Sequence, residues 1–262
     1  ILIDGTYYYN VTVIDKVGLE GSTETRSITL DTTPPTINYI EPTPADNLYY
    51  NQNTFTITTT ITEANVDAVT YTLYDTTGTA VDTSPPTTST SYTFETLADG
   101  IYTYDVKVID KAGSEDTTLP RTITIDTTGP TVNYDDTGTL PDNSFHNQNS
   151  IPITANIQED NIDTVTYTLY DSQGVQIGDP VILEEQYAPH TFTGLADATY
   201  KYDIKVIDKA GSEDTTLPRT ITLDTIQPEV EYIEPTPADN LYYNQNTFTV
   251  TTTITETNLE SA

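Results

Sequence analysis

Residues 55–61 read Phe-Thr-Ile-Thr-Thr-Thr-Ile, with most apolar side chains on the odd positions and threonine on every even one. Successive side chains of a β-strand point to opposite faces, so this period of two predicts a strand with one buried face. The same pattern returns at residues 151–157 and 248–254. Helix formers are scarce, and the Thr, Val, Ile and Tyr that strands favour are abundant. The sequence therefore predicts an all-β protein.

A repeat runs through the whole chain. The phrase Val-Ile-Asp-Lys occurs at residues 13–16, 108–111 and 206–209, and residues 39–56 are identical to residues 232–249. Self-similarity at a fixed period is typical of an array of like domains. The first and last residues fall inside repeats, so we expect a segment of a longer chain. The predicted organisation is the C-terminal half of a domain at 1–33, complete domains at 34–128 and 129–226, and the N-terminal half of a domain at 227–262.

Each repeat contains about seven short strand patterns separated by Pro, Gly, Asn and Asp turns, which is typical of an immunoglobulin-like β-sandwich. We expect tandem sandwiches of this type in an extended array. Because the chain has no Cys and no Trp, the core should be aliphatic and tyrosine-based. Tyr102, like Tyr7 and Tyr200 in the other copies, fits the corner where a tyrosine hydroxyl bonds back to the chain. The first complete repeat should have strands at 35–40, 54–62, 68–75, 91–96, 101–109 and 120–126, with a variable strand or two in the middle.

The charge of the chain limits its partners. Forty Asp and Glu against nine Lys and Arg give a formal net charge of −31. Such a field repels nucleic acid and anionic lipid and attracts cations. No stretch approaches the ~20 apolar residues of a membrane span, so we expect neither a nucleic-acid partner nor membrane insertion in this segment. No nucleophile with a base and no Gly-rich phosphate loop recurs, which argues against an enzyme.

Residues 108–131 (VIDKAGSEDTTLPRTITIDTTGPT) carry a family resemblance. They resemble the repeated bacterial and archaeal Ig-like domains of large surface adhesins, which tend to carry an Asp-x-Ala-Gly-Asn loop and an Asp-Thr-x-x-Pro linker. The resemblance implies an extracellular location at the cell surface, neighbouring repeats as the first partners, and a tip ligand that the sequence does not identify. The chain departs from the pattern at Ser114, Ser212 and Leu19, where the family often has Asn, and at Ile226-Gln227 in the third linker.

The sandwich topology predicts that acidic residues converge where one repeat meets the next. The loops that follow the second and sixth strands lie at the end where the first strand begins, so the incoming linker should meet them. We expect Asp31 to approach Glu63, Asn65 and Asp110. The copies predict two further groups and one residue that would serve a linker before residue 1: Asp126 with Glu159, Asn161 and Asp208; Asp224 with Glu256 and Asn258; and Asp15.

Oxygen ligands without His or Cys suit a hard cation such as calcium, which takes six to eight oxygens. Clustered carboxylates also repel one another unless a cation or protons intervene. The alternative is that these side chains are spread out and solvated, with loop Asp and Asn bonded to their own backbone. The ligand chemistry and the recurrence of all three phrases predict Ca²⁺ between domains.

Two classes of function remain open. The first is a structural segment of a large adhesin, fibre or filament, forming a semi-rigid rod stiffened by calcium at its junctions. The second is a carbohydrate-binding accessory module of a secreted polysaccharide-active enzyme, with tyrosine-bearing faces as the contact. Tyr49 and Tyr50, with their copies Tyr242 and Tyr243, are the candidates for an exposed platform. Copies in a fibre could also complete each other's half-domains by strand exchange, although truncation of a longer chain explains the same ends.

Overall fold

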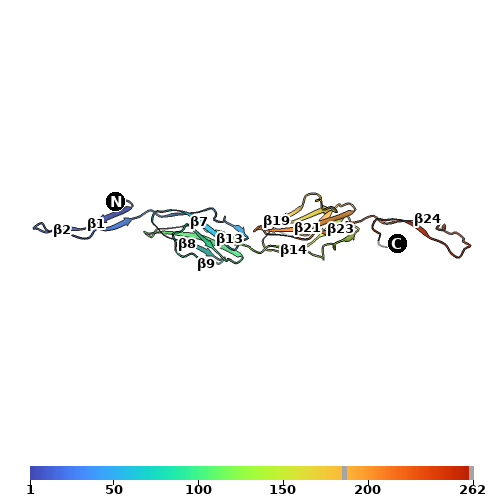
Figure 1. The fold of residues 1–262 in the computed structure, drawn as a ribbon, viewed down its shortest axis with the longest axis horizontal. Coiled ribbons are helices and arrows are strands. Elements are labelled where there is room, and N and C mark those ends of the chain that lie inside the picture. Colours follow the sequence, from blue (N-terminus) through green and yellow to red (C-terminus); the bar gives the residue numbers. More distant parts are fainter. Residues whose placement is uncertain (185–187, 260–262) are drawn as a thin grey trace. The chain divides into compact units, whose positions relative to one another are not determined.

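A computed structural model describes residues 1–184 and 188–259 of the chain. Every regular element among these residues is a β-strand. The described part of the chain contains no helix with the length and apolar character of a membrane span. Figure 1 shows these strands coloured along the sequence. The chain divides into two compact units, residues 1–130 with 207–213 and residues 131–206 with 214–262. The predicted class, all-β with tandem immunoglobulin-like sandwiches, is confirmed.

The first complete sandwich has two sheets. The smaller one has the order β10 (Ser91–Phe94), β7 (Phe55–Thr62) and β5 (Thr36–Ile40). The larger one has the order β6 (Leu48–Tyr50), β13 (Arg121–Ile125), β11 (Gly100–Asp110), β8 (Val66–Tyr74) and β9 (Ala80–Thr83), with β12 (Glu115–Thr117) also paired to β11.

Six of these strands coincide with the ranges predicted from alternation. The structure adds β6 and β12, which the sequence did not predict because each has only three residues. Leu48 pairs with Ile123 in the parallel ladder between β6 and β13. In β12 the residues Glu-Asp-Thr contain no apolar side chain, so no period of two was visible. Short edge strands of this kind are set by their neighbours and leave little signal in the local sequence.

The core lies between the two sheets and consists of the side chains that alternation placed inward. Ile57, Tyr71, Tyr104 and Val106 are fully buried. The hydroxyl of Tyr104 donates to the carbonyl oxygen of Pro44 at 2.6 Å, as a buried phenol requires. The aliphatic and tyrosine-based core expected from the lack of Cys and Trp is therefore present.

The tyrosine corner occurs in all three copies. The hydroxyl of Tyr102 donates to the carbonyl oxygen of Ala98 at 3.0 Å. Tyr7 donates in the same way to Ile3 at 2.8 Å, and Tyr200 donates to Ala196 at 3.0 Å. Each bond spans four residues, so it fixes the loop that precedes the sixth strand of the sandwich.

The second complete sandwich repeats this plan. Its larger sheet has the order β15 (Ser144–His146), β23 (Arg219–Leu223), β21 (Ala198–Asp208), β18 (Ile162–Asp171) and β19 (Val181–Glu184), with β22 (Glu213–Thr215) paired to β21. Two further pairs face it: β14 (Thr131–Tyr134) with β17 (Ala155–Gln158), and β16 (Ser150–Ile153) with β20 (His190–Thr193).

The first and last segments contain parts of a sandwich. The first has β1 (Gly5–Tyr9) paired to β4 (Arg26–Leu30) and β2 (Thr12–Ile14) paired to β3 (Glu20–Ser22), and the last has β24 (Glu229–Ile233) paired to β25 (Thr251–Thr255).

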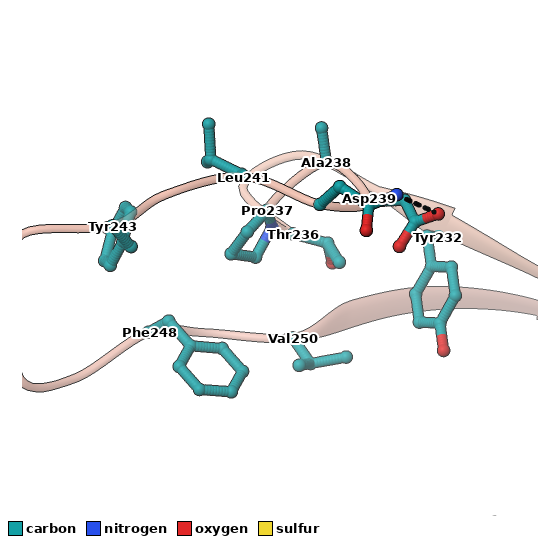
Figure 2. A pocket seen from close by; sticks show the side chains of 10 residues that line it. Tyr232, Thr236, Pro237, Ala238, Asp239, Leu241, Tyr243, Phe248 and Val250 are labelled. Carbon is teal, nitrogen blue, oxygen red and sulfur yellow. Dashed lines mark hydrogen bonds between the residues drawn. The ribbon is translucent and has the colours of Figure 1, made fainter.

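Identical sequence is buried differently in the last segment. Phe248 is 67% exposed, whereas its copy Phe55 is 3% exposed. Phe248, Val250, Pro237 and Tyr243 are among the residues that line a pocket in this segment (Figure 2). This face is the counterpart of the core of the complete domain, and the described residues of this segment do not supply the strands that cover it there.

We expect His190 to make the stability of the second sandwich depend on pH. Its ring lies 5.5 Å from that of Tyr167 and 4.6 Å from that of Phe192, and burial lowers the pKa of His190. A lowered pKa in the folded state means that the unfolded chain binds the proton more readily. The free energy of unfolding therefore keeps its full value above the unfolded-state pKa of about 6.5, and it falls as the pH drops below that value.

We therefore expect the second sandwich to lose stability between pH 7.5 and 5.5, and the variant His190→Tyr to lose less. Tyrosine is the matched substitution because Tyr92 occupies this place in the first sandwich, 5.8 Å from Tyr71. Amide hydrogen exchange of β18 and β20 at the two pH values measures the effect. An equal change in protection in both proteins would contradict the assignment to His190.

Candidate cation site

The site in the first unit is assembled from three separate stretches of chain. Asp31 directly follows β4 and opens the linker, Glu63 and Asn65 lie between β7 and β8, and Asp110 is the last residue of β11. Val106 and Val108 point into the core, and the period of two places Asp110 on the same inward side. A carboxylate is therefore carried into the end of the sandwich by the alternation that builds the core.

One carboxylate oxygen of Asp110 finds its hydrogen-bond donors in the loop that follows β11. Oδ1 accepts the backbone N–H groups of Ala112 and Ser114, both at 2.8 Å. Gly113 adopts a φ of +92°, a conformation that favours glycine, and this closes the turn. Asp75 forms the same turn, accepting from Thr77 at 2.8 Å and Thr79 at 2.9 Å. This turn is thus a general hairpin device and does not by itself indicate a ligand.

The other carboxylate oxygen of Asp110 has no such donor among the described residues. The residue is 1% exposed, and Oδ2 has no hydrogen-bond partner within the described part of the chain. Carboxylate oxygens of Asp31 and Glu63 lie with one of Asp110 so that all three are within 4.8 Å of one another. A buried charged oxygen without a partner is costly. The carboxylate of Asp75 does not carry this cost, because Asp75 is only half-buried.

Asn65 links the two other carboxylates. Its side-chain Nδ2 donates to Oδ2 of Asp31 at 2.9 Å, and its backbone N–H donates to Oε1 of Glu63 at 2.6 Å. The structure thus brings together all four residues that the sequence predicted for this junction. At 4.8 Å and an effective dielectric constant of 20, two carboxylates repel by about 3 kcal/mol. A cation between them would reverse the sign of this energy.

The donor set has the chemistry of a hard-cation site. Three carboxylates offer oxygen atoms with a formal charge of −3, and neither nitrogen nor sulfur ligands are among them. Calcium accepts such ligands at flexible geometry and completes its shell with backbone oxygens and water. The residues therefore fit a calcium ion, and the identity of the metal stays a prediction.

The predicted ligands of the next copy belong to both units: Asp126 and Asp208 to the first, Glu159 and Asn161 to the second. Asp208 is 1% exposed, Oδ1 accepts the N–H of Ser212 at 2.8 Å, and Oδ2 has no hydrogen-bond partner among the described residues. The backbone N–H of Asn161 donates to Oε1 of Glu159 at 2.6 Å, as at Asn65. Asp126 is buried. The grouping of these four residues stays a prediction from the register of the repeat.

The third copy lies within the second unit and repeats the contacts of the linker. Nδ2 of Asn258 donates to Oδ2 of Asp224 at 2.8 Å, and its backbone N–H donates to Oε1 of Glu256 at 2.8 Å. Asp15 is not brought beside any other predicted ligand in the described part of the chain. Its Oδ1 accepts the N–H groups of Val17 and Leu19, both at 2.9 Å. Asp15 therefore forms the same loop turn as Asp110.

Sequence reasoning missed a further aspartate that binds the linker. Oδ1 of Asp99 accepts the N–H of Thr127 at 3.0 Å and its hydroxyl at 2.7 Å, while Oδ2 accepts the hydroxyl of Thr128 at 2.8 Å. The hydrogen bond from the Thr127 hydroxyl is the main cause of a lowered pKa for Asp99. The signal was present in the sequence, because Asp4, Asp99 and Asp197 recur in register with the linker threonines.

The fold and the junction geometry define a class, the Ig-like β-sandwich module. Residues 47–127 match the family model of the bacterial Ig-like domain. The match covers most of the first complete sandwich, and it confirms the resemblance to bacterial Ig-like domains stated from residues 108–131. No curated protein matches the chain.

Two solved structures are similar at low sequence identity. The fibronectin(III)-like modules of CbhA from Clostridium thermocellum are 14% identical, with 72% of this chain and 93% of that chain covered and a TM-score of 0.37. Dimeric latent PorU from Porphyromonas gingivalis is 13% identical, with 82% of this chain and 24% of that chain covered and a TM-score of 0.28. At these TM-scores neither likeness bears on function.

The oxygen of Asp110 without a hydrogen-bond partner leads us to predict how Asp110→Asn changes the stability of the protein. Asparagine keeps one oxygen for Ala112 and Ser114, removes one negative charge, and places an NH₂ donor where Oδ2 has no partner. Without calcium we expect the variant to be at least as stable as the parent, because about 3 kcal/mol of repulsion per carboxylate pair is relieved. Thermal melting in a chelator measures this.

The same variant should bind one calcium ion fewer per chain by titration calorimetry. Asp75→Asn is the matched control, because Asp75 forms the same turn away from the acidic cluster and its substitution should leave calcium binding unchanged. Equal calcium stoichiometry in Asp110→Asn and the parent would contradict the assignment.

Proposed function

We propose that the chain is a structural segment of a large extracellular surface protein, such as an adhesin stalk, fibre or filament. Its tandem Ig-like domains form a semi-rigid rod, and calcium stiffens each junction. The observation that carries the proposal is the buried Oδ2 of Asp110, which has no hydrogen-bond partner among the described residues and lies with the carboxylates of Asp31 and Glu63 within 4.8 Å. The role is non-catalytic, as is typical of Ig-like modules.

The energetics of calcium binding support a stiffening role. Sites of the extracellular class bind at about 0.1 to 1 mM. In about 10 mM calcium, such a site stabilises its bound form by roughly 1.4 to 2.7 kcal/mol. Contacts between domains in one chain are otherwise small and permit motion, so this energy is sufficient to restrict a hinge. Pro34, Pro35, Pro130 and Pro228 limit bending of the linkers as well.

The rod would consist of separate domains that meet at the linkers. Domains end at residues 33, 128 and 226, each shortly after the Asp-Thr phrase of a linker. Each domain has its neighbouring repeats as partners, with other copies of the chain in a fibre and a ligand at the tip of the full protein. A net charge of −31 disfavours nucleic acid as a partner.

The alternative, a carbohydrate-binding module, receives less support from the tyrosines. Tyr49 and Tyr50 are half-buried in the first sandwich, where an exposed stacking platform was expected. Tyr71 and Tyr167 lie in the cores. The copies of Tyr49 and Tyr50 in the last segment, Tyr242 and Tyr243, are exposed.

Small-angle X-ray scattering with and without a chelator tests the rod. We expect the maximum dimension to be well defined in 10 mM calcium and the distribution of distances to broaden when calcium is removed. The melting temperature should also fall on removal of calcium. Unchanged scattering together with an unchanged melting curve would refute calcium stiffening.

A glycan array separates the two classes of function. We expect no reproducible glycan binding by the chain, because its large aromatic side chains serve mainly the cores. Reproducible binding that is lost in Tyr49→Ala would favour the carbohydrate-binding module instead.

A further inference from the structure

Each linker is tied to the domain that it leaves by an aspartate in the corner loop. In the first copy, Oδ1 of Asp4 accepts the N–H of Thr32 at 3.1 Å and its hydroxyl at 2.8 Å. Oδ2 of Asp4 accepts the hydroxyl of Thr33 at 2.8 Å. The same three bonds recur between Asp99 and the threonines at 127 and 128. We call this arrangement the linker clamp.

The clamp acts on the two residues that directly follow the linker aspartate. Asp31 precedes Thr32, and its Oδ2 accepts from Asn65 at 2.9 Å on the side of the following domain. The corner loop that carries Asp4 is itself fixed, because Tyr7 donates to Ile3 at 2.8 Å. A continuous set of hydrogen bonds thus runs from the corner loop through the linker to the acidic cluster.

We propose that Asp4 is a positioning residue that orients Asp31 toward the cation site, and that Asp99 and Asp197 do the same for Asp126 and Asp224. This inference rests on the proposed calcium function. A linker that is already ordered loses less conformational entropy when the cation binds. The clamp therefore raises the affinity for calcium without contacting the ion.

The third copy is a natural variant of the clamp. Ile226 stands where Thr33 and Thr128 stand in the other copies, so it has no hydroxyl to donate to the second oxygen of the clamp aspartate. The hydroxyl of Thr225 still donates to Oδ1 of Asp197 at 2.9 Å. The third linker is therefore held less firmly than the first, and the site that it enters has no counterpart of Asp110 among the described residues.

Calcium titration of the whole chain, followed by NMR of side-chain amides, tests the clamp. The side-chain amide of Asn65 reports on the first junction, because its Nδ2 donates to Asp31. Thr33→Ile copies the third linker, and we expect calcium to bind about tenfold more weakly at Asn65, the equivalent of one more residue to order. Thr33→Ser keeps the hydroxyl and is the matched control with unchanged affinity.

The outcomes separate a positioning role from a structural one. A merely structural role predicts that Thr33→Ile lowers the melting temperature in a chelator while the calcium affinity at Asn65 stays the same. That result, in a parent protein whose Asn65 signal does respond to calcium, overturns the clamp and leaves the calcium site intact. If the parent signal does not respond up to 10 mM calcium, the calcium site is wrong and the clamp proposal fails with it.

Discussion

Burial of a carboxylate is the constraint on which the junction depends. A charged oxygen that leaves water must find hydrogen bonds or an opposite charge. Asp110 has both oxygens removed from solvent, and only Oδ1 is supplied by the backbone of its own loop. The position follows from the fold, because the strand that buries Val106 and Val108 ends on the same face. The core and the acidic cluster are thus consequences of one alternating pattern.

This constraint also explains why the acidic phrases recur in register. A solvated carboxylate on the surface could stand at a neighbouring sequence position with little effect on stability. A carboxylate that faces the linker has to stand at one position of the repeat. Asp31 reaches Asn65 because β4 ends directly before it and because Asp4 holds the threonines that follow it. The repeat therefore preserves a connection between domains in addition to a fold. A net charge of −31 attracts cations from the medium to such a connection.

The sequence predicted the fold well where alternation was long, as in residues 55–62, and where a tyrosine corner had a fixed place, as at Tyr102. It predicted the approach of Asp31 to Asn65 because sandwich topology fixes which loops meet at which end. It missed β6 and β12, because three-residue strands leave no period. It also missed the linker clamp, because Asp99 stands beside Gly100 in a loop where an aspartate has an ordinary local explanation. The half-buried state of Tyr49 depends on packing that the local sequence does not encode.

Anomalous scattering from a crystal of the chain grown in calcium tests whether the buried carboxylate of Asp110 binds a cation. We expect an anomalous peak at about 2.3 to 2.6 Å from oxygens of Asp31, Glu63 and Asp110, with Oδ2 of Asp110 as one of the ligands. A structure at saturating calcium in which this place holds no anomalous peak, and in which Oδ2 of Asp110 is hydrogen-bonded to water instead, would contradict it.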